Sequence, residues 1–225
     1  MPDVVLLSKQ DPFSEMAGRV ARTAFGDAVL WLPGRRGDPV PPELGAHTFR
    51  VVLSFLSPWI VPGKVLRGAQ VALNWHPASR EYPGTGCYNF ALYEGALEYG
   101  AVCHWMAEVP DTGEIVEERR FPVWPQDSVE TLKLRTMIVM LAMFQDMVCK
   151  LVVGAAPPPS KGSAWSRKPF KRRDLEQLNV IDPTMSDEEV RRRVRAMTYP
   201  GHPGPHVVVA GERFVVPVPD RKPLA

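Results

Sequence analysis

An amide, an imidazole and a carboxylate are spaced in this chain so that they could act together on a carbonyl group. Asn74 and His76 are separated by one residue in a strand-like run, and Asp111 lies in a Pro-Asp-Thr-Gly turn. Because side chains alternate between the two faces of a strand, Asn74 and His76 should point the same way. An amide and an imidazole can stabilise an oxyanion, and a nearby carboxylate orients the imidazole and favours its charged form. The set predicts acyl transfer, although each residue alone could simply end a strand or form a turn.

The elements that would position these residues alternate between strands and helices. Apolar runs predict strands at 4–7, 28–32, 49–55, 70–74, 101–106 and 115–123. Helices are predicted at 12–25, 63–67, 87–98 and from Ser128 to about Val153. This order is typical of an α/β fold with a Rossmann-like, open and mostly parallel sheet, in which ligands bind at the carboxyl ends of the strands. The dinucleotide signature G-x-G-x-x-G is absent after the first strand, which disfavours a dinucleotide-dependent oxidoreductase.

Composition divides the chain into a catalytic domain and a small C-terminal appendage. We expect the catalytic domain at 1–153, a proline-rich linker at 154–164, the appendage at 165–218 and a loose tail at 219–225. The appendage should contain a helix that begins with a capping box at Ser186, followed by a β-hairpin around Gly211.

Charge and cysteine content indicate which partners and which cellular compartment to expect. With 27 basic and 25 acidic residues the net charge is +2, so nothing favours nucleic acid or a membrane surface as partner. Three cysteines form an odd set without C-x-x-C spacing, which fits a reducing compartment. The apolar runs near the N-terminus and at 137–144 are too short for a signal peptide or a membrane span. We therefore expect a soluble cytoplasmic protein.

Short motifs around the three polar residues resemble those of the folate-dependent formyltransferases. The matching pieces are Asn74-x-His76-Pro77, Tyr82-Pro83-Gly84, the run from Gly100 to Met106, and Asp111-Thr112-Gly113. Ser57 to Pro62 resembles the loop that receives the pterin of 10-formyltetrahydrofolate. The resemblance covers roughly residues 49–123. It implies the formyltransferase fold, 10-formyltetrahydrofolate as formyl donor, and no metal.

The same resemblance implies roles for individual residues. Asn74 and His76 would stabilise the oxyanion as an amine attacks the formyl group, and Asp111 would orient and charge His76. Protons would leave the amine through His76 or through a water bound to Asp111. The residues expected to contact the cofactor are Phe55, Trp59, Ile60, Val61, Val109 and Gly113.

Branches of this family differ in the amine that they formylate. Methionyl-tRNA formyltransferases carry a larger C-terminal domain than this length allows, and formyltetrahydrofolate hydrolases carry an extra N-terminal domain. Glycinamide ribonucleotide formyltransferases have a glycine-rich phosphate loop where this chain has Ser8-Lys9-Gln10-Asp11-Pro12. Short sugar N-formyltransferases are most similar in length, in the run from Gly84 to Leu92, and in a C-terminal hairpin that can form a homodimer. The expected acceptor is therefore the amine of a nucleotide-linked amino sugar.

Residues for the acceptor are harder to predict. The segment 165–173 is basic and aromatic and could bind a diphosphate and a base, but a solvated linker face is the simpler interpretation. The candidates are Lys9, Arg80, Tyr82, Trp165 and Lys171.

Other functions stay open from the sequence alone. The acceptor could be glycinamide ribonucleotide, an aminoacyl group or a small metabolite. A metal-dependent hydrolase could use His76, His104 and Asp111, although the usual ligand spacing is absent and His104 reads as a strand residue beside the site. A formyltransferase fold used only for binding is disfavoured by the intact Asn74, His76 and Asp111.

Overall fold

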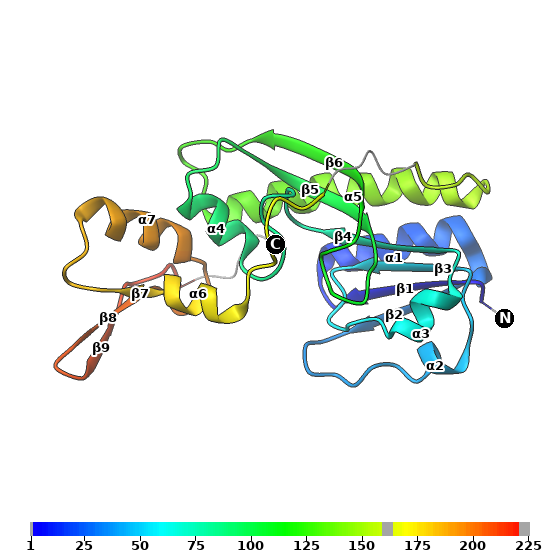
Figure 1. The fold of residues 1–225 in the computed structure, drawn as a ribbon, viewed down its shortest axis with the longest axis horizontal. Coiled ribbons are helices and arrows are strands. Elements are labelled where there is room, and N and C mark those ends of the chain that lie inside the picture. The colour runs from blue at the N-terminus through cyan, green and yellow to red at the C-terminus, as the bar shows by residue number, and fades with distance from the viewer. Residues whose placement is uncertain (1, 159–163, 221–225) are drawn as a thin grey trace.

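The computed structural model describes residues 2–158 and 164–220. Within them, six strands form one sheet in the order β2-β1-β3-β4-β5-β6 (Figure 1). Its strands are β1 (Val4–Lys9), β2 (Val29–Gly34), β3 (Val51–Phe55), β4 (Val71–His76), β5 (Glu98–Trp105) and β6 (Ile115–Pro122). β2, β1, β3 and β4 run parallel, whereas β5 is antiparallel to both β4 and β6. The predicted α/β class with a mostly parallel sheet is confirmed.

Helices cover both faces of this sheet. α1 (Pro12–Phe25) and α5 (Val129–Val152) lie on one face, and the short α2 (Glu43–Ala46) and α3 (Gly63–Gly68) lie on the other (Figure 1). On the α5 side, the ring of Phe144 meets Phe55 and Trp75 edge-on, with centroids 5.4 and 4.8 Å apart. Because Trp75 faces this core, its neighbours Asn74 and His76 are turned to the opposite side.

The ends of the two long helices follow from local chemistry. Asp11 accepts a hydrogen bond from the amide of Ser14 at the start of α1, with Pro12 in the first turn. Ser128 and Thr131 form a reciprocal capping box at the start of α5. Among the described residues, no helix is both long and apolar enough to cross a bilayer.

Several element boundaries differ from those predicted. α4 (Cys87–Tyr93) ends well before Glu98, because Gly95 adopts a left-handed conformation and the chain then enters β5. α7 (Asp187–Met197) begins with a hydrogen bond to Ser186, but the reciprocal half of the predicted capping box is missing. The carboxylate of Glu189 instead accepts from Tyr93 and Arg193.

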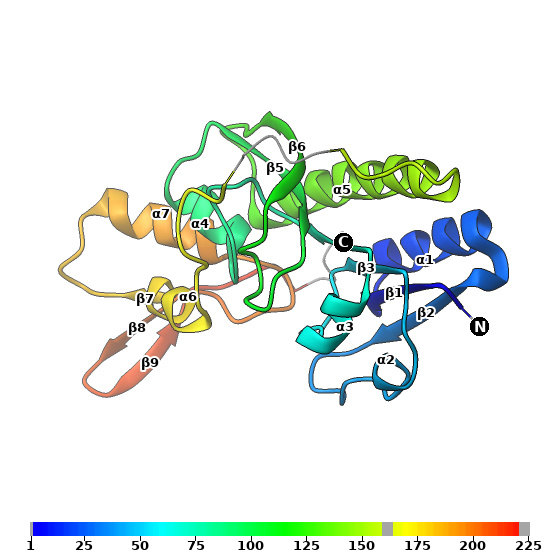
Figure 2. The same ribbon diagram turned by 45° about the vertical axis from the view of Figure 1, so that its right-hand side comes forward.

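The C-terminal part packs on α4 rather than standing apart. It contains α6 (Arg172–Leu178), β7 (Val180–Ile181), α7, β8 (His206–Val209) and β9 (Glu212–Val215). Asn89 donates to the carbonyl of Ala196 at 2.7 Å, and Tyr93 donates to Glu189 at 2.9 Å, which ties α4 to α7. The hairpin of β8 and β9 was predicted, whereas α6 and β7 were not. The hairpin projects away from the body of the protein (Figures 1 and 2).

The segment before α6 is paired with the loop that follows β4. The amide of Phe170 donates to Pro83, and the amide of Thr85 donates back to Phe170, each at 2.9 Å. The ring of Phe170 stacks on Phe90 at 3.8 Å. This part of the 165–173 segment is therefore docked on the catalytic body and is not the solvated linker face that the sequence favoured.

Gly84 allows this docking, because its φ is +87° and a Cβ there would lie 2.4 Å from the carbonyl oxygen of Phe170. We expect Gly84→Ala to lower the free energy of unfolding by about 3 kcal/mol, through backbone strain plus displacement of the docked segment. Gly37→Ala is the matched control, since its φ is +95° with nothing within 4 Å. It should cost only the strain, about 1 kcal/mol. Equal losses in urea titrations would contradict a docking role for Gly84.

Candidate active site

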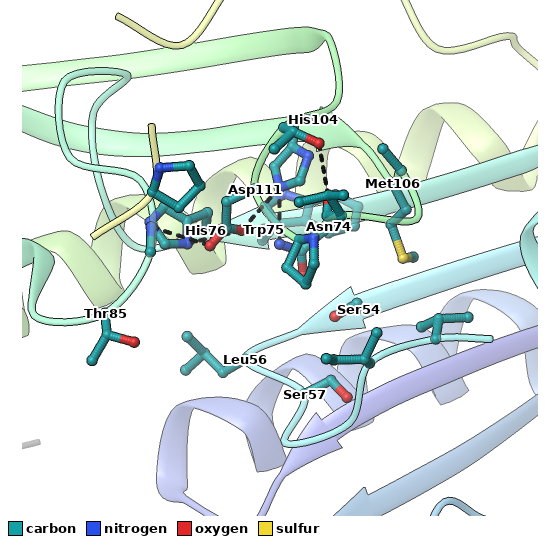
Figure 3. Close-up of a pocket in the computed structure, with 18 of the residues that line it drawn as sticks. Ser54, Leu56, Ser57, Asn74, Trp75, His76, Thr85, His104, Met106 and Asp111 are labelled. Atoms are coloured by element: carbon teal, nitrogen blue, oxygen red, sulfur yellow. Dashed lines mark hydrogen bonds and ion pairs between the residues drawn. The ribbon is translucent and has the colours of Figure 1, made fainter. Parts of the chain in front are cut away.

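A cavity of about 810 Å³ opens at the carboxyl ends of β3 and β4 (Figure 3). Its polar floor is formed by Asn74, His76, His104 and Asp111, which come from β4, β5 and the loop between β5 and β6. Asn74 and His76 lie toward the carboxyl end of the parallel strand β4, and the antiparallel β5 with the loop after it places His104 and Asp111 against them. The Asn-His-Asp set predicted from the sequence is brought together in space.

Asn74 is held by a histidine on the neighbouring strand. Asn74 and His104 are direct partners in the antiparallel pairing of β4 and β5. Nδ1 of His104 donates to the carbonyl of Trp105 at 2.8 Å, so in the neutral ring Nε2 is an acceptor. Nδ2 of Asn74 lies 3.0 Å from that Nε2 and donates to it. A carboxamide nitrogen carries two hydrogens, so one donor of Asn74 stays available to a ligand.

His76 is buried with an acceptor at each ring nitrogen. Its Nε2 lies 3.2 Å from the carbonyl oxygen of Tyr82 and its Nδ1 lies 3.4 Å from Oδ1 of Asp111. Burial lowers the pKa of His76 and outweighs Asp111, which acts to raise it. The sequence-based expectation that Asp111 charges His76 therefore meets an opposing and larger effect, and the neutral imidazole is favoured.

Asp111 is the electrostatic centre of the cluster. Its backbone has φ of +55°, and Oδ2 accepts a hydrogen bond from the amide of Gly84 at 3.2 Å. Burial would raise the pKa of Asp111, but the interactions with His76, with His104 and with this amide lower it to about 2. The carboxylate therefore stays charged at any physiological pH.

Trp165 covers the two histidines from the C-terminal segment. Its ring meets His76 and His104 edge-on, with centroids 5.5 and 5.2 Å apart. Its Nε1 donates to the carbonyl of Gly113 at 3.0 Å. Trp165 thus links the appendage to the polar cluster.

The residues expected to contact a cofactor divide into two groups. Trp59, Ile60, Val61 and Val109 line the cavity, with Ile60 and Val109 largely exposed at its rim. Phe55 does not wall it, because its side chain is fully buried against Phe144 on the other face of the sheet. Gly113 is not among the residues that line it, and a Cβ there would collide with the carbonyl oxygen of Trp105.

The residues expected to bind an acceptor are also divided. Lys9 and Lys171 line the cavity. The guanidinium of Arg80 is instead held by Glu118 through two hydrogen bonds of 2.9 and 2.7 Å, so its placement is structural. Tyr82 offers its carbonyl to His76 while its ring is buried beside Tyr99.

Some cavity residues were missed by sequence reasoning. Ser54 and Leu56 flank Phe55 and line the cavity, so alternation along β3 with the correct phase would have found them. Lys168 reaches the cavity from the docked segment. His104 was noted as a neighbour, but its contact with Asn74 needed the register of β4 against β5. Within the described ranges, no group of three or more His, Cys, Asp or Glu residues is arranged to hold a metal ion.

Comparison with known proteins agrees with this geometry. Residues 48–145 match the family model described as Formyl transferase, a span that contains Asn74, His76 and Asp111. The resemblance to formyltransferases is thereby confirmed. GDP-perosamine N-formyltransferase of Brucella melitensis is 29% identical over 160 residues, which are 70% of this chain and 60% of that protein. The chain thus spans about three fifths of the length of this curated relative.

Solved structures share the fold over nearly the whole chain. A Mycobacterium tuberculosis protein described as a candidate sugar N-formyltransferase superposes with a TM-score of 0.80 at 20% identity, covering 99% of this chain and 100% of that one. An N-formyltransferase of Helicobacter canadensis, solved with folinic acid and dTDP-3-aminofucose, superposes with a TM-score of 0.70 at 14% identity. It covers 88% of this chain and 81% of that one. At these identities the likeness establishes the formyltransferase fold.

The low pKa of Asp111 predicts a pH-dependent share of stability. A carboxylate with a pKa of about 2 in the folded chain and 3.8 when unfolded stabilises the fold above the unfolded pKa, and this share is lost as the pH falls through the folded pKa. Its size is about 2 kcal/mol. Asp111→Asn should therefore flatten the fall in unfolding free energy between about pH 4 and pH 2. Urea titrations across this range that give parallel curves for both proteins would contradict the charged cluster.

Proposed function

We propose that the protein transfers the formyl group of 10-formyltetrahydrofolate to the amine of a nucleotide-linked amino sugar. The observation that carries this proposal is the cluster of Asn74, His76 and Asp111 on the floor of a cavity of about 810 Å³. That volume suits a drug-sized organic ligand. The match to formyl transferases supports the reaction class, and the sugar N-formyltransferases among its relatives support the acceptor class.

The cavity fits the formyl donor in character as well as in size. Its wall is largely apolar, with Leu56, Trp59, Val61 and Met106 offering surface for a pterin ring. When bound, 10-formyltetrahydrofolate supplies an activated formyl group. Backbone groups of the loop 59–61 and of the loop that carries Val109 would hydrogen-bond the ring, and Trp59 itself is fixed by its Nε1 donating to Asp38. The proposal calls for no metal ion.

In this proposal Asn74 stabilises the oxyanion that develops on the formyl group. Its second N–H can donate to the formyl oxygen as negative charge grows there, because His104 occupies the first. A donor that is already oriented does not have to be reorganised during the reaction, and this preorganisation is the main reason why such donors lower the activation barrier. His104 is therefore a positioning residue in this proposal.

In this proposal His76 and Asp111 take up the proton that the attacking amine loses. With Nε2–H donating to the carbonyl of Tyr82, Nδ1 of the neutral ring holds a lone pair beside Oδ1 of Asp111. The attacking amine must lose a proton as its nitrogen bonds to the formyl carbon. Nδ1 can accept that proton, and the resulting imidazolium is stabilised by the Asp111 carboxylate. The same proton would pass to the donor nitrogen that leaves as its bond to the formyl carbon breaks. The lowered pKa of His76 keeps the ring neutral, and so basic, before the reaction.

The rest of the chain takes a supporting role. We propose 1–153 as the catalytic unit and 165–218 as the appendage that completes the acceptor side, with 154–164 linking them and 219–225 as a tail. Part of the linker and the end of the tail lie outside the described residues. Cys87, Cys103 and Cys149 are free thiols, which supports a reducing compartment such as the cytoplasm.

Formyl transfer should be visible as a mass gain of one formyl group on an amino-sugar nucleotide incubated with 10-formyltetrahydrofolate. A panel of GDP- and dTDP-linked amino sugars tests the acceptor. Asn74→Ala should lower kcat by about 100-fold or more while the KM for the donor changes little, because the amide acts on charge that develops in the transition state. No transfer across the panel would reject the acceptor class, and an unchanged kcat in Asn74→Ala would reject the role of the amide.

The projecting hairpin supports a homodimer. Val208, Val209, Phe214 and Val215 are each about half exposed on β8 and β9, which is costly for an apolar strand pair in water. We expect Phe214→Glu to shift the protein from dimer to monomer in sedimentation experiments. Leu97→Glu, a charge placed on an exposed apolar residue of the body, is the control and should leave the dimer intact. A monomeric wild-type protein at micromolar concentration would contradict the dimer.

A further inference from the structure

Trp165 reaches the polar cluster from the C-terminal segment without lining the active-site cavity. Its ring meets the imidazoles of His76 and His104 edge-on, with centroids 5.5 and 5.2 Å apart. Among the described residues, both histidines line the cavity, whereas Trp165 does not. The indole therefore packs against the two imidazoles from a side that a ligand in the cavity does not occupy.

The indole is fixed in place by its own hydrogen bond and by the residue that follows it. Nε1 of Trp165 donates to the carbonyl of Gly113 at 3.0 Å, which ties the ring to the turn that also carries Asp111. The amide and the hydroxyl of Ser166 both donate to the carbonyl of Arg80, at 3.1 and 3.2 Å. These contacts lock the ring before any ligand binds, as a support for a catalytic group requires.

The groups that Trp165 contacts are almost closed to water. The exposed fraction of the side chain is 8% for His76, 2% for His104 and 16% for Asp111. An indole covers a large area of its neighbours, and the ring of Trp165 is itself partly buried against both imidazoles. Truncation of this side chain would open a path for water to the two histidines.

Water at His76 would change its charge. In the proposed reaction His76 must be neutral in order to accept a proton, and burial lowers its pKa against the opposing attraction of Asp111. The other titratable or charged groups beside His76 or along the same cavity are His104, Lys9, Lys168 and Lys171. Trp165 carries no charge, so it acts on this balance by excluding water.

We propose that Trp165 is a positioning residue for formyl transfer, whose ring holds the imidazoles of His76 and His104 in place and keeps water away from them. It does not touch the reacting atoms. The appendage thereby contributes to the chemistry of a cluster that lies in the catalytic body. The inference rests on the proposed function for the reaction itself, whereas the protection of His76 from water can be measured without any substrate.

A proton NMR titration of the imidazoles in the full-length protein tests this protection. The signals of His76 are assigned by their absence from His76→Ala. We expect the pKa of His76 to be higher in Trp165→Ala than in the wild-type protein, because the imidazolium is then hydrated while Asp111 still attracts it. In Trp165→Phe the pKa should stay close to that of the wild-type protein, since a phenyl ring still excludes water.

Formyl transfer should respond in the same order. Trp165→Ala should lower kcat by about tenfold or more, as expected when catalytic groups lose their exact placement. The acid limb of kcat/KM should move to higher pH, because His76 becomes protonated sooner as the pH falls. Trp165→Phe should recover most of the rate and the pH profile. Binding of folinic acid should be unchanged in both variants, because Trp165 does not line the cavity.

Trp124→Ala is the control for the loss of a tryptophan. The side chain of Trp124 is 55% exposed and does not line the active-site cavity. This variant should keep the wild-type titration of His76, the wild-type kcat and the wild-type pH profile.

The outcomes separate this inference from the proposed function. A pKa of His76 that is unchanged or lower in Trp165→Ala would overturn the inference, even where formyl transfer is observed. A loss of activity with an unchanged pH profile and no recovery in Trp165→Phe would overturn it as well, since Trp165 would then serve only to dock the appendage. If the pKa of His76 rises in Trp165→Ala while the wild-type protein formylates no amino-sugar nucleotide, the protection of His76 stands and the proposed reaction fails.

Discussion

The contact between Asp111 and His76 at the end of β4 is the interaction on which the rest of the site depends. Burial of this carboxylate is costly, and three groups lie against it: the amide of Gly84 donates to it at 3.2 Å, and the imidazoles of His76 at 3.4 Å and His104 at 3.5 Å attract it whenever they are protonated. Each comes from a different element, so the charge fixes the positions of β4, β5 and the loop after β4 relative to one another. Gly84 in turn receives the segment before α6. One buried charge thus connects the sheet, the catalytic candidates and the appendage.

The antiparallel direction of β5 relative to β4 determines which side chains meet in the cluster. If β5 ran parallel to β4, His104 would not face Asn74, and the amide would lack the acceptor that orients it. The loop between β5 and β6 then returns to the carboxyl end of β4, where Asp111 meets His76. The appendage closes the arrangement, because Trp165 meets both histidines edge-on and the segment after it lines the active-site cavity.

Alternation along a strand is enough to predict that Asn74 and His76 share a face, and the caps at Asp11 and Ser128 are enough to place the two long helices. Features set by tertiary contact are beyond that reasoning. The expectation that Phe55 contacts the pterin was wrong. The residues of β3 that face the cavity depend on which face of the sheet α5 covers, and strand alternation alone does not tell this. Arg80 was a candidate for binding the acceptor, but its guanidinium is bound by Glu118. Glu118 lies on β6, far from Arg80 in sequence, so the pairing could not be predicted. The segment before α6 was interpreted as a linker because it is docked through backbone hydrogen bonds to Pro83 and Thr85. Backbone groups are the same in every residue, so the sequence does not indicate such contacts.

The most direct test of the account follows the carbon that is transferred. The protein would be incubated with 10-formyltetrahydrofolate labelled with ¹³C in the formyl group and with an amino-sugar nucleotide that the protein binds. NMR then shows where the label goes. The account predicts a ¹³C formamide on the sugar, formed in step with tetrahydrofolate and greatly slowed in His76→Ala. Label that appears only as free formate, or transfer that is unchanged in His76→Ala, would contradict it.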